Sequence, residues 1–117
     1  MVNNNGSLAP HVEWAREGTP VSRPVALFVD RPGGPLDTLA SNSDVATFLN
    51  DRFHPLFRVA PEGEAPSLNF YSADGCLLAG PLRPTDPAAF IADANKVVQM
   101  PDASGHSATF FSLACPR

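Results

Sequence analysis

Apolar positions in this chain gather in short runs separated by proline and glycine, and the run at residues 25–30 stands out. Its sequence, Val-Ala-Leu-Phe-Val-Asp, has the length and character of a central parallel strand covered on both faces. Prolines follow at once and prevent the strand from continuing. Because ligands of α/β proteins gather in loops after such strands, the loop is the first candidate site: Arg31, Pro32, Gly33, Gly34 and Pro35.

Apolar residues at helical spacing predict two main helices. The first covers residues 44–53, where Ser41 supplies N-cap chemistry and one face is apolar. The second covers residues 86–100, because Asp86 is a good N-cap and Pro87 a good first residue. The apolar residues of these two faces are Val45, Phe48, Leu49, Phe53, Phe90, Ile91, Ala94, Val97 and Val98.

Two shorter helices are expected nearer the N-terminus. Residues 8–17 carry Val12 and Trp14 among charged neighbours, a pattern that we interpret as an amphipathic helix ended by Gly18. Residues 36–40 are expected to form one helical turn.

Further strands are predicted at residues 56–60, 67–72 and 76–80, the last two joined by an Asp-Gly hairpin turn. The first of them completes a βαβ unit with residues 25–30, so those two strands are parallel. The core is expected to bury six residues almost fully: Leu27, Val29, Phe48, Leu49, Phe70 and Ile91.

A βαβ unit followed by a hairpin and a helix resembles the thioredoxin fold. Residues 32–36, Pro-Gly-Gly-Pro-Leu, are similar to the Trp-Cys-Gly-Pro-Cys run of thioredoxins, and residues 44–53 resemble the helix that follows it. Ala65-Pro66, just ahead of a strand, looks like the cis-proline site of that family. The resemblance implies a three-layer α/β/α sandwich with a central mixed sheet over residues 8–100, and a cis bond at Ala65–Pro66.

The departures from that family decide what activity the resemblance can imply. Thioredoxin chemistry needs a reactive thiolate and a second, resolving thiol, whereas Gly33 and Leu36 stand at the two aligned positions. We therefore expect a non-catalytic module, an assembly subunit or accessory factor, that binds another protein through the loop and through Ala65 and Pro66. Two adjacent glycines would leave backbone amides free for a partner's main chain. The competing hypothesis is a thiol-dependent enzyme that uses Cys76 or Cys115.

Composition narrows the partners and the compartment. The 117 residues fit one domain, with residues 1–7 expected to be disordered and residues 101–117 a tail. A net charge of −4 gives no electrostatic reason to expect nucleic acid or a membrane surface. Residues 1–7 lack the features of a signal peptide, and no apolar run reaches the roughly 20 residues of a membrane span, so we expect a cytoplasmic protein. Association of the chain with itself stays open.

Candidate chemistry outside the loop is sparse. In a reducing compartment Cys76 and Cys115 are expected to be free thiols, with a disulfide between them the less favoured alternative. The three histidines lie far apart in sequence and lack ligand spacing, so neither a metal site nor a cofactor is expected. Asp30 is either a buried acid or, the favoured alternative, a solvated partner of Arg31.

Overall fold

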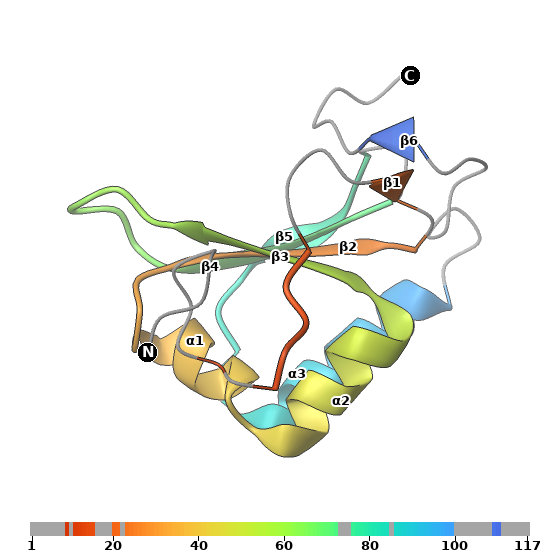
Figure 1. Ribbon diagram of the computed structural model, residues 1–117, viewed down its shortest axis with the longest axis horizontal. Helices are drawn as coiled ribbons and strands as arrows, with labels where there is room; N and C mark the ends of the chain where they lie inside the picture. The colour runs from red at the N-terminus through yellow and green to blue at the C-terminus, as the bar shows by residue number, and fades with distance from the viewer. Residues whose placement is uncertain are drawn as a thin grey trace.

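The computed structural model describes residues 9, 11–15, 23–72, 76–84 and 86–99 in full, and the backbone alone of residues 20–21 and 109–110 (Figure 1). The larger sheet consists of β2 (Val25–Asp30), β3 (His54–Val59), β4 (Ser67–Tyr71) and β5 (Leu77–Leu82). The helices of the described residues are α1 (Pro35–Ala40), α2 (Ser43–Arg52) and α3 (Pro87–Val98). A short pair joins β1 (Pro20–Val21) to β6 (Thr109–Phe110) in antiparallel fashion. The predicted tails, residues 1–7 and 101–117, lie outside the described residues apart from β6.

The strand order is β3-β2-β4-β5. β3 is parallel to β2, β4 is antiparallel to β2, and β5 is antiparallel to β4. The chain is therefore an α/β protein with a mixed sheet, and the predicted βαβ unit and the antiparallel pairing of the last two strands are confirmed. The Asp-Gly turn predicted between those two strands lies outside the described residues. All three described helices lie on the same side of the sheet (Figure 1). The described helices thus form one layer, whereas the sandwich implied by the resemblance has helices on both faces.

Strand β2 is buried on both faces because its side chains alternate between two apolar clusters. Ala26 and Phe28 belong to the cluster on the helix side, while Val25 and Leu27 meet Leu56 of β3 on the opposite face. None of these β2 side chains is more than 3 % exposed. The strand predicted at residues 25–30 is confirmed with the same bounds.

The helices begin where side chains satisfy their first amides. Asp86 accepts a hydrogen bond from the Ala89 N–H and Pro87 is the first residue of α3, as predicted. At α2 the N-cap is Asn42 and not Ser41, since Asn42 Oδ1 accepts from the amides of Asp44 and Val45.

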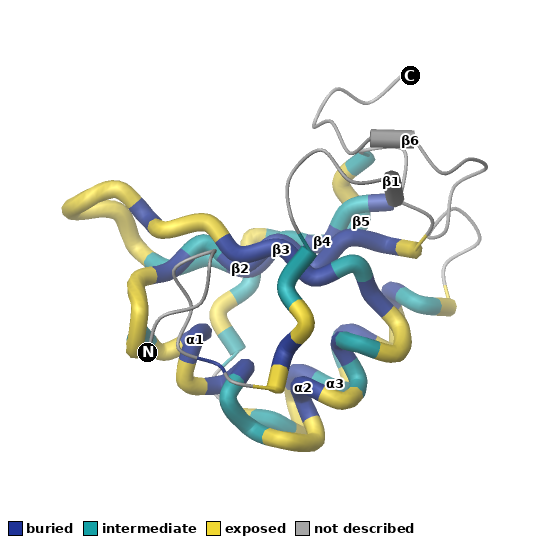
Figure 2. The backbone as a smooth tube through the Cα atoms, in the orientation of Figure 1, coloured by how far each residue is buried: buried dark blue, intermediate teal, exposed yellow. Residues whose placement is uncertain are grey.

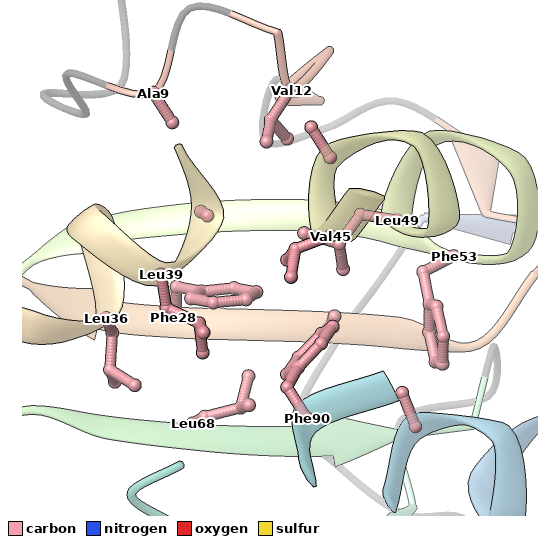
Figure 3. Packing of buried hydrophobic residues seen from close by; sticks show 14 of the residues in the cluster. Ala9, Val12, Phe28, Leu36, Leu39, Val45, Leu49, Phe53, Leu68 and Phe90 are labelled. Atoms are coloured by element: carbon pink, nitrogen blue, oxygen red, sulfur yellow. The ribbon is translucent and has the colours of Figure 1, made fainter. Parts of the chain in front are cut away.

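The core lies between the sheet and the helices, and it shows as the buried inner face of each element (Figure 2). Aromatic rings fill its middle, with Phe28, Phe53, Phe70 and Phe90 each fully buried. Figure 3 shows the side chains of α1, α2 and α3 converging on the sheet. Of the six predicted core residues, Leu27, Leu49 and Phe70 are buried, whereas Val29, Phe48 and Ile91 are only partly buried.

The N-terminal segment, defined as Ala9 and residues 11–15, is not helical, so the helix predicted over residues 8–17 is wrong. Asn50, in the last turn of α2, donates to the His11 carbonyl and accepts from the Glu13 N–H. Ala15 N–H donates to the carbonyl of Pro55. These contacts satisfy the backbone of an extended segment, which a helix would have satisfied internally.

The two edge strands, β3 and β5, each contain a proline, Pro55 and Pro81. The cis peptide bond of the described residues precedes Pro81 and not Pro66, so the cis bond predicted at Ala65–Pro66 is wrong. Pro66 leads directly into β4, whose first residue, Ser67, already pairs with Val29. An extended trans approach therefore suffices there.

Candidate functional site

The loop of residues 31–35 leaves the carboxyl end of β2 and enters α1 directly. Its first three residues and Pro35 are exposed, while Gly34 is half-buried. Gly34 N–H donates to the Arg31 carbonyl at 2.8 Å, which closes a tight turn in which Gly33 takes a φ of 78°. That backbone conformation favours glycine, and it explains one of the two glycines at this point.

Asp30 organises the loop from inside. Its side chain is 1 % exposed. Oδ1 accepts from the Arg31 N–H at 2.7 Å, and Oδ2 accepts from the amides of Leu36 and Asp37 at 2.8 and 3.0 Å. The carboxylate thereby ties the end of β2 to the start of α1. The favoured prediction of a solvated pair with Arg31 is wrong, because backbone amides and not the guanidinium surround this acid.

A second buried carboxylate, that of Asp37, completes the arrangement. Its Oδ2 accepts from the Gly33 N–H at 2.9 Å. Both glycine amides of the loop are therefore bonded within the chain, so the expectation that they are free for a partner's backbone is wrong. The loop therefore offers neither glycine amide to a partner.

Ala65 and Pro66 lie at the same end of the sheet as the loop. Val29 pairs with Ser67, so the chain enters β4 where β2 is about to end. Ala65 is exposed, and the Pro66 carbonyl accepts from Arg83 Nε at 3.0 Å. The structure thus brings the predicted site residues to one end of the sheet.

Val59 is a member of this surface that the sequence analysis missed. It ends β3 opposite Asp30 and is 54 % exposed, although it stands in a strand of the sheet. Residues 61–65, which follow it, are exposed as well. No sequence pattern separates Val59 from the buried residues of the same strand, because its exposure depends on what lies beside the end of the sheet.

A pocket of about 370 Å³ opens beside the loop, at the point where the three helices begin. It is lined by Pro35, Thr38, Leu39, Ser41, Asn42 and Pro87. The hydroxyl and amide groups of this lining already serve the chain: Ser41 Oγ donates to the Asp37 carbonyl, and Asn42 caps α2. The pocket therefore offers shape and apolar surface more than free polar groups.

Cys76 is disulfide-bonded, so the prediction of a free thiol there is wrong. Its backbone closes the hairpin, with the Ser72 N–H donating to the Cys76 carbonyl and the Cys76 N–H to Ser72 Oγ. Distance along the chain does not prevent a disulfide, which requires only that two sulfurs meet in the fold. Cys115, the other cysteine of the sequence, lies outside the described residues.

His54 makes the stability of the fold depend on pH. Burial, and then the nearby Arg23 guanidinium, lower the pKa of His54. The unfolded chain therefore binds a proton more readily than the folded chain. We expect full stability above the ordinary histidine pKa of about 6.5 and a loss as the pH falls below it. Urea midpoints at about pH 7.5 and about pH 5.5 measure the loss. The variant His54→Gln should lose less stability between these two pH values than the parent chain, whereas His11→Gln should lose as much as the parent. An equal loss in the two variants would contradict the assignment of the pH dependence to His54.

Two further findings bear on the chemistry of the described residues. They contain no group of three or more His, Cys, Asp or Glu side chains arranged to hold a metal ion. Among their helices, none is long and apolar enough to cross a membrane.

A comparison with family models, curated proteins and solved structures found no match to the chain.

Proposed function

We propose that this chain is a non-catalytic protein-binding module of thioredoxin-like topology, whose partner docks on the end of the sheet formed by residues 31–35, Val59 and Ala65. The order of elements, a βαβ unit, an antiparallel hairpin and a final helix, supports the thioredoxin-like part of the proposal. Gly33 and Leu36 at the positions of the thioredoxin cysteines support binding without disulfide exchange.

The observation that carries the proposal is a loop held rigidly from inside while its side chains face outward. Asp30 and Asp37 accept hydrogen bonds from amides of the loop and of the start of α1, and the flanking prolines limit the loop backbone further. A surface that is already ordered loses little conformational entropy when a partner docks. Arg31, Pro32 and Pro35 then offer a cation and two apolar rings beside the exposed Val59.

The test replaces side chains that face outward and spares those that hold the loop. In the double variant Arg31→Glu, Val59→Ser we expect partner affinity to fall about tenfold or more, because arginine is enriched among the few residues that carry most of the binding energy of an interface and the second change removes apolar contact beside it. The chain as bait captures the partner from its native host, and titration calorimetry then compares the variants.

A matched control is available at exposed sites away from the loop. The double variant Lys96→Glu, Leu77→Ser likewise replaces a cation by glutamate and an exposed apolar residue by serine, on α3 and β5, and Leu77 is 55 % exposed. If both double variants are folded and bind equally well, the partner docks elsewhere and the proposed surface is wrong. A captured protein that is the chain itself would identify a homo-oligomer.

A further inference from the structure

The docking site of the N-terminal segment contacts the main chain of that segment as well as its side chains. Asn50 spans Val12: its Nδ2 donates to the His11 carbonyl and its Oδ1 accepts from the Glu13 N–H, both at 2.8 Å. A single side-chain amide thereby bonds the two backbone groups on either side of one residue. Every extended peptide offers the same two groups at this spacing.

The edge of the sheet contributes a third contact of the same kind. The Ala15 N–H donates to the Pro55 carbonyl at 2.8 Å. Pro55 has no N–H to give in return, so an ordinary strand ladder cannot form at this point of β3. The Asn50 side-chain amide supplies a donor to the segment where the edge of β3 lacks one. The site therefore binds extended backbone without a regular ladder of strand hydrogen bonds.

Two side chains of the segment add shape to this recognition. Val12 is 7 % exposed and, with Ala9, points toward α1 and α2 (Figure 3). Trp14 lies edge-on to Phe28 and Phe57, with ring centroids 5.4 and 5.3 Å apart. Glu13, between them, is exposed. The site therefore fits a β-branched residue, any spacer, and an aromatic residue.

Trp14 does not fit this site perfectly. Its Nε1 is buried and has no hydrogen-bond partner, and a buried donor left unpaired is unfavourable. An aromatic ring without a donor would escape that cost. A peptide with such a ring would therefore have an advantage over the chain's own segment at this site.

We propose that this site binds an extended segment of a partner protein with the pattern β-branched residue, spacer, aromatic residue, and that the N-terminal segment occupies it as an internal ligand. The partner segment replaces the segment on Asn50 and Pro55 and inserts its aromatic ring between Phe28 and Phe57. This surface and the end of the sheet near Arg31 are separate, so the proposal stands apart from the proposed function.

The first experiment uses the unaltered chain, in which Trp14 is the sole tryptophan and reports on its own site. The probe is a synthetic peptide with the sequence of residues 8–17 and phenylalanine in place of tryptophan. Added at increasing concentration, it should displace the segment, shift the Trp14 emission to longer wavelength and open the indole to acrylamide quenching. A peptide of the same composition in scrambled order should do neither.

The second experiment removes the aromatic ring of the chain's own segment and measures the affinity of an added peptide directly. The Trp14→Ala chain should bind a fluorescein-labelled peptide of residues 8–17, as followed by anisotropy. Adding Asn50→Leu should weaken that binding about tenfold or more, because two hydrogen bonds are lost. Adding Asp51→Ala instead, at the exposed neighbouring residue, should leave the affinity unchanged.

Each arm can overturn the proposal. Trp14 emission that stays unmoved at saturating peptide overturns it, even if Trp14→Ala fails to fold. Equal affinity of the Asn50→Leu and Asp51→Ala chains overturns it too, since the peptide would then bind elsewhere. A dimer by light scattering in which the segment is exchanged would name a second copy as the occupant and overturn the assignment to a foreign partner. The variants at Arg31 and Val59 leave this site intact, so failure of one proposal is distinguishable from failure of the other.

Discussion

Replacing Phe53 by alanine is expected to lower the free energy of unfolding by about 3–5 kcal/mol. Phe53 is fully buried where α2 gives way to β3, and its ring centroid lies 5.3 Å from that of Phe70. Truncation would leave a cavity among aromatic rings that come from separate elements and cannot all move inward. Urea denaturation followed by circular dichroism measures the loss.

Phe48 provides the matched control for this prediction. It stands on α2, and its ring centroid lies 5.9 Å from that of Phe53, but it is only partly buried. Phe48→Ala should therefore cost clearly less than Phe53→Ala. An equal loss of unfolding free energy in the two variants would contradict the prediction, because it would mean that both rings stabilise the core equally despite their difference in exposure.

Replacing Gly34 by alanine should cost about 3 kcal/mol, because hydrogen bonds to a charged group are each worth about 1.5–3 kcal/mol. A Cβ on Gly34 would overlap the buried Asp30 carboxylate. The carboxylate can move aside only by giving up amides of the loop and of α1, which it holds at 2.7–3.0 Å. Thermal or urea unfolding measures the effect.

Two comparisons isolate that cause. Gly63→Ala, at a φ of 86° with nothing within 4 Å of the added Cβ, should cost only the left-handed backbone term of about 1–2 kcal/mol. In an Asp30→Ala background, Gly34→Ala should cost far less than in the parent chain, since its obstacle is gone. If the stability losses of Gly34→Ala and Asp30→Ala simply add in the double variant, the overlap of the new Cβ with the Asp30 carboxylate is not the cause.

Elements with local causes could be predicted from the sequence. The β2 strand follows from a run of apolar residues stopped by proline, and α3 from Asp86 and Pro87, and both stand where expected. The mixed sheet follows from their order along the chain. Ser41 and Asn42 are equally suitable caps by type, so the sequence could not decide which of the two would turn its side chain onto α2.

The N-terminal segment could not be predicted in the same way because its cause is distant. Val12 and Trp14 are two residues apart, a spacing that also suits an extended chain with one buried side. What decides between the two is Asn50, 37 residues from Glu13, whose amide captures the backbone. A residue that stabilises a segment so far away leaves no pattern near that segment.

The candidate site was found by position but misjudged in its chemistry. A loop after a central strand was the right place to look, yet the sequence does not show that α1 folds back and aims its first amides at Asp30. For the same reason the glycine amides looked free while Asp37 and Arg31 bond them. Val59 and the disulfide of Cys76 likewise depend on which parts of the chain meet in space.

The prolines of β3 and β5 affect how readily the protein aggregates at high concentration. Sheets grow into aggregates when an edge strand offers an unbroken row of N–H and C=O groups to a neighbouring molecule. Pro55 and Pro81 interrupt both outer rows of this sheet, and the pairing of β4 with β5 is irregular as well. A short, mostly apolar sheet is in this way protected against regular ladder pairing with strands of other molecules, which is the first step toward fibrils.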